Sequence, residues 1–204
     1  MIDTSVPAYP LYMYKEDTDS YPSCSLPEGY RFLFYRKGDE IYWSDIMCSL
    51  GFFETRERAL EIFERDFISA EAELSERMLF VVAPSGEYVA TCTLWDGLWL
   101  GECRQRFHWL GVKDSHAGLG IARALMTRLF ILYRDLGYRG FLYLITGVRY
   151  YPAVSIYRQY GFSEYWGDTE PGRPENEKFA EWNRINREIL DERLPRVEDA
   201  EEDI

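Results

Sequence analysis

A glycine turn joins an apolar strand to a long amphipathic helix in the middle of the chain, and this order limits the folds available. The stretch runs from His108 to Leu125 and reads HWLGVKDSHAGLGIARAL. Gly118 and Gly120 lack a Cβ atom, so the backbone can bend tightly and bring its amides against a bulky anion. The following helix points its positive end at the same place. The stretch predicts a diphosphate site, although a glycine turn that binds nothing fits it equally well.

Size, charge and cysteine spacing narrow the class of protein. The 204 residues are 47% hydrophobic, which is enough for one α/β domain. The formal net charge of -12 argues against a binder of nucleic acid or of anionic membranes, since both need clustered Lys and Arg. No apolar stretch is long enough to cross a bilayer, and the four cysteines lack the spacing of a zinc site. We therefore expect a cytoplasmic protein that holds no metal.

The hydrophobic periodicity predicts an α/β (α+β) fold with a mixed central sheet of about six or seven strands flanked by helices. The strands are expected over residues 30–37, 78–83, 88–95, 104–112, 140–146 and 162–166, with 78–83 and 88–95 joined as a β-hairpin and followed by a loop over 95–99. The helices are expected over 40–50, from 56 onward with Thr55 as the N-cap, and over 121–136, 152–160 and 175–190. The proline-rich residues 1–29 predict an extended N-terminal arm, residues 30–190 a single domain, and the acidic residues 191–204 a disordered tail.

Three stretches in the second half of the chain carry motifs at a defined separation. They are Leu110-Gly111-Val112 leading into residues 116–125, the strand that ends at Thr146, and Tyr157-Arg158-Gln159-Tyr160-Gly161-Phe162. Together they cover residues 105–166 and resemble the GNAT superfamily of N-acyltransferases. The first looks like the family's acyl-CoA signature, Gln/Arg-x-x-Gly-x-Gly/Ala, and the last like its Tyr-x-x-x-Gly-Phe helix ending. The resemblance implies a GNAT-like acyl-CoA N-acyltransferase fold.

The resemblance also implies acetyl-CoA as the cosubstrate. Its pyrophosphate would be held by the backbone around the glycine turn, at Ala117, Gly118, Leu119, Gly120, Ile121, Ala122 and Arg123. Backbone groups of Leu110 and Val112 would pair with the pantetheine arm, and Gly111 could sit at a β-bulge that frees them. Ala117 and Leu119 stand where the family often has basic or Gln side chains, which should weaken phosphate binding without abolishing it, because backbone N–H groups are the donors.

Acyl transfer to an amine needs a base for the amine, donors for the oxyanion and a proton for the thiolate. His108 is the candidate base, because arylalkylamine acetyltransferases of this family carry a histidine at what we take to be the same position, and Arg106 stands where other members have a glutamate. A histidine that only holds the strand by hydrogen bonds explains the residue at least as well. Tyr157 is the candidate acid, since a phenol with a reference pKa near 10 can protonate a thiolate. The amide of Leu110 would meet the oxyanion.

The resulting hypothesis is an N-acetyltransferase that moves an acetyl group from acetyl-CoA to a primary amine through a ternary complex. A small molecule or an amino acid is favoured over a protein as the acceptor, and either a monomer or a homodimer is expected. The alternative is a non-catalytic acyl-CoA-binding regulatory module, because a fold does not fix a function.

Overall fold

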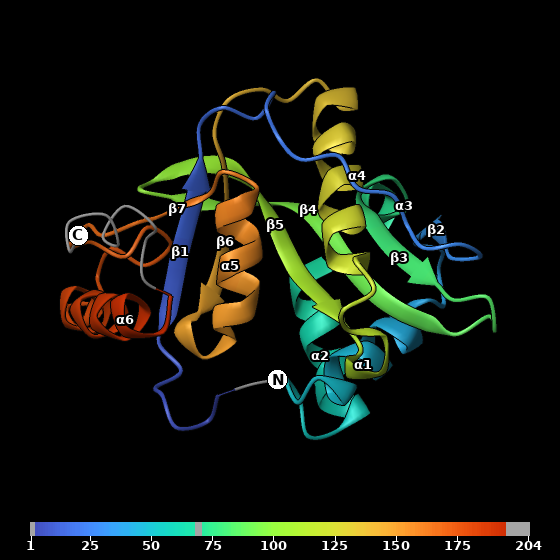
Figure 1. Cartoon of the computed structure of the whole chain (residues 1–204), viewed down its shortest axis with the longest axis horizontal. Coiled ribbons are helices and arrows are strands. Elements are labelled where there is room, and N and C mark those ends of the chain that lie inside the picture. The colour runs from blue at the N-terminus through green and yellow to red at the C-terminus, as the bar shows by residue number, and fades with distance from the viewer. Residues whose placement is uncertain (1–2, 68–70, 195–204) are drawn as a thin grey trace, which may run out of the picture. The chain divides into compact units, whose positions relative to one another are not determined.

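The seven strands found among the described residues form one mixed sheet in the order β2-β3-β4-β5-β6-β1-β7 (Figure 1). This computed structural model describes residues 3–67 and 71–194. The fold class predicted from the sequence, an α/β protein with helices flanking the sheet, is confirmed. The elements are β1 (Pro10–Lys15), β2 (Arg31–Phe34), α1 (Glu40–Ser49), α2 (Arg56–Phe67), α3 (Glu71–Arg77), β3 (Met78–Val82), β4 (Tyr88–Trp99), β5 (Glu102–Val112), α4 (Ile121–Asp135), β6 (Leu142–Gly147), α5 (Tyr151–Gln159), β7 (Ser163–Glu164) and α6 (Phe179–Arg193).

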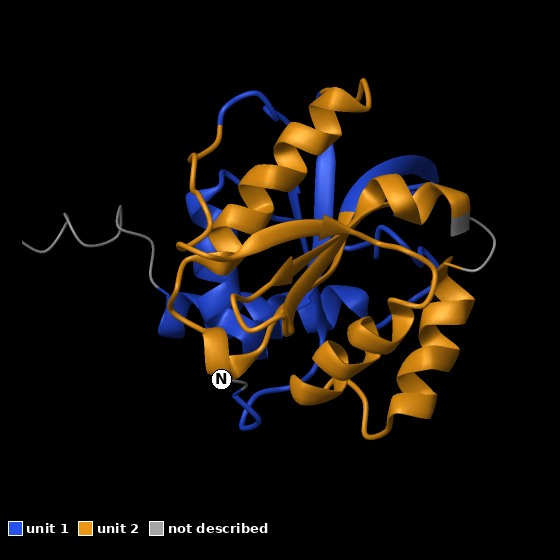
Figure 2. Ribbon diagram, turned by 90° about the vertical axis from the view of Figure 1, so that its right-hand side faces the viewer, with its two compact units in different colours: residues 1–20, 96–106, 140–204 blue, residues 21–95, 107–139 orange. Residues whose placement is uncertain are grey.

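The chain divides into two compact units, which Figure 2 draws in different colours. Unit 1 comprises residues 1–20, 96–106 and 140–204, and unit 2 comprises residues 21–95 and 107–139. The predicted tail over 191–204 begins inside α6, which ends at Arg193, and from residue 195 onward it lies outside the described residues.

Strand β1 lies at the centre of unit 1, within the segment for which the sequence predicted an extended arm. It pairs antiparallel with both β6 and β7, so that Met13 is opposite Leu144 on one side and Glu164 on the other. Leu11 and Met13 have no exposed surface. Pro10 does not prevent this pairing, because it is the first residue of the strand, a position where sheets tolerate proline.

Aromatic side chains and buried amides hold α6 onto the strands of unit 1. Phe179 packs with Tyr12, Trp99 and Tyr143 in one core cluster. Further along the helix, the Asn186 side chain donates a hydrogen bond of 3.0 Å to the carbonyl oxygen of Pro10. The sequence predicted a loop over 95–99, but β4 continues to Trp99, whose ring is almost fully buried in this cluster.

Helices cover both faces of the strands in unit 2. Trp43 of α1 and Phe67 of α2 pack in one core cluster with Phe80 of β3. On the other face Phe107 of β5 contacts Phe130 of α4, with ring centroids 5.1 Å apart. The predicted hairpin of β3 and β4 and the predicted long helix α4 are confirmed, while α3 was not predicted from the sequence.

Threonine caps the start of α2 as the sequence predicted. The Oγ1 atom of Thr55 accepts a hydrogen bond of 3.2 Å from the backbone amide of Arg58, which satisfies one of the free amides of the first turn. Among the described helices, none is long and apolar enough to span a membrane.

Candidate functional site

The glycine turn ahead of α4 has the backbone conformation that the sequence predicted. Gly118 and Gly120 both have positive φ, 78° and 79°, which L side chains rarely adopt. Gly120 is the N-cap of α4, and no side chain within the described part of the chain caps that helix. The first hydrogen bond of the helix runs from the Ala124 amide to the Gly120 carbonyl oxygen, 3.0 Å. The amides of the first turn therefore have no intrahelical acceptor and can receive an anion.

Two residues of the predicted phosphate cradle, Ala117 and Leu119, have surroundings that the sequence did not predict. The amide of Ala117 already donates to the carbonyl oxygen of Asp114, at 3.1 Å, within a short 3-10 turn over Asp114–His116. This amide therefore already has an acceptor within the turn. Leu119 is 48% exposed, which leaves an apolar side chain at the surface of the cradle.

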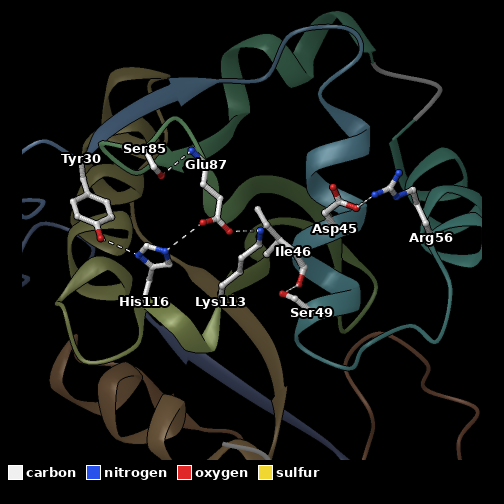
Figure 3. A network of polar contacts seen from close by, with 9 residues as sticks. All are labelled: Tyr30, Asp45, Ile46, Ser49, Arg56, Ser85, Glu87, Lys113 and His116. Atoms are coloured by element: carbon white, nitrogen blue, oxygen red, sulfur yellow. Dashed lines mark hydrogen bonds and ion pairs between the residues drawn. The ribbon is translucent and has the colours of Figure 1, made fainter.

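A chain of polar contacts fixes the other side of the turn (Figure 3). Nδ1 of His116 lies 2.8 Å from the hydroxyl oxygen of Tyr30, and its Nε2 lies 3.7 Å from a carboxylate oxygen of Glu87. The other oxygen of Glu87 accepts a hydrogen bond of 2.8 Å from the ammonium group of Lys113. This hydrogen bond is the main reason that the pKa of Glu87 is lowered. The network ties both ends of the 3-10 turn to the β3–β4 hairpin and to the segment before β2.

Strand β5 is irregular at Trp109, the residue after the candidate base. Trp109 has φ 55°, in the left-handed region that non-glycine residues rarely occupy. Phe107 contacts Phe130 of α4, whereas His108 contacts Phe67 of α2, as alternation in a strand requires. Trp109 then turns to the same face as His108 instead of the opposite one. One extra residue that shifts the alternation in this way has the geometry of a β-bulge.

The irregularity lies two residues before the position that the sequence suggested. Gly111 is not among the residues with positive φ. Its lack of a side chain has a different cause, because a Cβ atom there would come within 2.6 Å of Cδ1 of Leu50 and 3.1 Å of Cε of Met47. Gly111 is therefore required by the close approach of α1, and Trp109 carries the bend.

A carboxylate from α2 holds both side chains at the bend. Oδ2 of Asp66 accepts a hydrogen bond of 3.0 Å from the indole N–H of Trp109 and lies 3.3 Å from Nε2 of His108. Burial acts to raise the pKa of Asp66, but the hydrogen bonds from His108, Trp109 and Arg65 outweigh it and lower the pKa to about 2. Asp66 is thus ionised at neutral pH beside the His108 ring. The sequence contained no signal for it, because it lies 42 residues before His108.

Tyr157, the candidate acid, belongs to unit 1 and lies near the end of α5. Its side chain is buried, and its carbonyl oxygen accepts the backbone amide of Phe162 at 3.0 Å. Gly161 ends the helix with φ 81°, and a Cβ atom there would lie 2.5 Å from the Nζ atom of Lys15. These contacts explain the glycine in the Tyr-x-x-x-Gly-Phe motif. The acid role of the Tyr157 hydroxyl stays a prediction.

Unit 2 also contains a separate pocket of about 280 Å³. It is lined by side chains of the β2–α1 connection, the start of α1, α2 and α3, namely Tyr35, Lys37, Glu40, Leu60, Phe63, Glu64, Phe67 and Leu74. None of them was a predicted site residue. Phe67 is shared with the bend, since its ring lies 5.8 Å from the His108 ring. Among the described residues, no group of three His, Cys, Asp or Glu side chains is arranged to hold a metal ion.

Several solved structures share this fold. A GCN5-related N-acetyltransferase from Sphaerobacter thermophilus is 25% identical, with a TM-score of 0.57 over 78% of this chain and 50% of that one. A tandem GNAT protein from the clavulanic acid biosynthesis pathway is 13% identical, with a TM-score of 0.54 over 80% of this chain and 52% of that one. Glucosamine-6-phosphate N-acetyltransferase from Arabidopsis thaliana is 14% identical, with a TM-score of 0.50 over 70% of this chain and 97% of that one.

The sequence pattern of the Acetyltransferase (GNAT) family matches residues 11–162. The chain therefore belongs to the GNAT acetyltransferase family, as the motifs around Gly118 and Tyr157 suggested. It spans about half the length of the first two solved structures named above. A search of curated protein sequences gave no match.

Proposed function

We propose that this chain is an N-acetyltransferase that moves the acetyl group of acetyl-CoA to a primary amine of a small molecule or an amino acid. One observation carries the proposal: β5 holds His108 beside an ionised carboxylate at a bend, and the same strand runs directly into the glycine turn. A base and an anion-binding backbone on one continuous segment suit a ligand with a thioester at one end and a diphosphate in its middle.

The proposed mechanism assigns one task to each group. His108 accepts the proton of the acceptor amine, directly or through water, so that the nitrogen lone pair can attack the thioester carbonyl carbon. The amide of Leu110 donates to the oxyanion that forms with the new C–N bond. Tyr157, which the family motif assigns to the sulfur, protonates the thiolate as the C–S bond breaks. The nitrogen is positively charged after the attack, so it loses its second proton as the intermediate collapses, and this proton returns Tyr157 to its phenol form through water. His108 then releases its proton to solvent, and the products are an amide and free coenzyme A.

The fit of acetyl-CoA to the cradle rests on the backbone and not on side chains. Gly118 and Gly120 have open space within 4 Å of the Cβ position, so a bulky anion can approach their amides. The amides of the first turn of α4, which have no acceptor within the helix, supply donors that the changed residues Ala117 and Leu119 do not. The pyrophosphate would therefore be bound through Gly118, Leu119, Gly120, Ile121, Ala122 and Arg123.

Release of coenzyme A thiol tests the proposal. Acetyl-CoA is incubated with small primary amines, with amino acids and with a lysine-containing peptide, and the thiol is measured. We expect release that depends on the amine and is fastest for a small molecule or an amino acid. Binding of acetyl-CoA without release for any amine would contradict the enzyme and favour the regulatory module, the reading that the changes at Ala117 and Leu119 keep open.

Two substitutions of His108 distinguish a base from a histidine that only holds the strand by hydrogen bonds. A base must be neutral to act, so the rate falls as pH drops below the pKa of His108. We expect His108→Ala and His108→Gln both to remove this acidic limb from the pH–rate profile. Glutamine keeps an N–H donor for Asp66 but does not titrate. If His108→Gln recovers the turnover that His108→Ala loses and keeps the acidic limb, then His108 only holds the strand and another group is the base.

A further inference from the structure

A single carboxylate oxygen of Asp66 faces both donors at the bend of β5. The Asp66 and His108 side chains are 13% and 15% exposed, so water competes little for this contact. The second carboxylate oxygen accepts a hydrogen bond of 2.8 Å from Nε of Arg65. The arrangement satisfies the carboxylate on both oxygens and fixes its direction toward the ring.

We propose that Asp66 is a positioning residue that fixes the His108 tautomer, with the proton on Nε2 and the lone pair on Nδ1. A neutral imidazole has one N–H donor and one acceptor nitrogen. Because Nε2 faces a carboxylate, which only accepts, Nε2 is the donor and Nδ1 is left as the basic atom. The catalytic consequence rests on the proposed function: Nδ1 of His108 is the atom that receives the proton of the amine.

The left-handed conformation of Trp109 makes this arrangement possible. In a regular strand Trp109 would face away from α2, and its indole N–H would not reach Asp66. With φ 55°, Trp109 lies on the same face as His108 and supplies the second donor to Oδ2. Backbone strain of this kind persists only where the surroundings hold it. The indole hydrogen bond and the packing of Trp109 on Trp43 and Phe53 provide that support.

Among the described residues, charged and titratable groups of α2 and β4 face this pair. Asp66 and Arg65 come from α2, and the Cys92 thiol of β4 lies 3.5 Å from the carbonyl oxygen of His108. Burial raises the pKa of Cys92, so the thiol stays neutral near pH 7. The carboxylate of Asp66 therefore favours the imidazolium form of His108. Its replacement by an amide should make His108 titrate at a lower pH.

Nitrogen NMR of the histidine rings tests the proposal without any assay of activity. The chain contains two histidines, so His108 and His116 can be assigned with one His116→Gln variant. In the wild-type protein we expect the neutral His108 ring to carry its proton on Nε2. In Asp66→Asn we expect its titration midpoint to fall by about one pH unit, with His116 unchanged. A wild-type ring protonated on Nδ1, or an unchanged midpoint in the variant, would overturn the proposal; the wild-type result decides even if the variant does not fold.

Kinetics then tests whether Asp66 acts through His108. We expect Asp66→Asn to lower kcat by at least about tenfold, to move the acidic limb to lower pH and to leave the KM for acetyl-CoA within about twofold. Asp66→Glu should recover part of kcat, because it keeps the charge. Asp45→Asn is the matched control, since Asp45 pairs with Arg56 at the surface of α1 and α2.

A double substitution separates the failure of this inference from that of the proposed function. In the His108→Gln background we expect Asp66→Asn to reduce kcat no further. Independent losses that multiply would show that Asp66 acts by another route, and would overturn the inference. If no amine releases thiol from the wild-type protein, the proposed function fails, and the ring tautomer alone still decides the role of Asp66.

Discussion

At the scale of single residues, the Tyr157 hydroxyl is the group whose removal tests the acid role most directly. A phenol can donate to a thiolate whose conjugate acid has a reference pKa of about 8.5, and phenylalanine keeps the ring but not the proton. We expect Tyr157→Phe to lower turnover at least about tenfold with little change in acetyl-CoA affinity. Tyr151→Phe, at the first residue of the same helix, is the control. Unchanged turnover in Tyr157→Phe would exclude the acid role.

Asp66 also makes the stability of the protein depend on pH in the acid range. Its pKa is about 2 in the folded protein against 3.8 for the unperturbed group. The lowered pKa means that Asp66 contributes stability above about pH 4, and this contribution is lost as the pH falls through 2. The unfolding free energy of each protein is measured with urea at pH 5 and at pH 2. We expect the decrease from pH 5 to pH 2 to be about 2 kcal/mol smaller in Asp66→Asn than in wild type. Equal differences would contradict the hydrogen bonds described for the carboxylate.

At the scale of elements, the two ends of α4 allow a matched comparison. Gly120 precedes the helix and Gly137 follows it, with φ 79° and 84° and no atom within 4 Å of either Cβ position. Alanine at either position should therefore cost a similar backbone strain of roughly 1 kcal/mol. We expect only Gly120→Ala to raise the KM for acetyl-CoA, by roughly tenfold, because the N-terminal end of a helix presents amides to an anion and the C-terminal end presents carbonyl oxygens. Similar KM values for the two variants would argue against the cradle.

At the scale of the whole molecule, ligand binding should appear as thermal stabilisation. A ligand that binds only the folded chain at about 100 times its Kd adds about 2.7 kcal/mol, which raises the Tm of a chain of 204 residues by roughly 5–10 °C. We expect this shift with acetyl-CoA and none with ATP, because no Lys-Ser/Thr pair follows the glycines. The shift should persist in Asp66→Asn and shrink in Gly120→Ala. A shift of equal size with ATP would indicate a general nucleotide site.

The features that the sequence predicted correctly depend on neighbours along the chain. The glycine turn, helix α4 and the β3–β4 hairpin each follow from a local pattern of apolar residues and turn residues, and Thr55 caps α2 because its acceptor lies three residues before the amide. Local physics suffices there, since backbone conformation and side-chain periodicity are fixed within a few residues.

Partners distant in the chain decided the rest. Strand β1 is in the sheet because it pairs with β6, more than 120 residues later, and proline composition alone favoured an extended arm. Gly111 is a glycine because α1 approaches it, and Trp109 is left-handed because Asp66 and the aromatic core hold it there. The sequence by itself determined the local elements, namely the glycine turn, the helix that follows it and the strand that carries His108. Only the tertiary structure decided how the His108 ring is oriented, because its hydrogen-bond partner belongs to another helix.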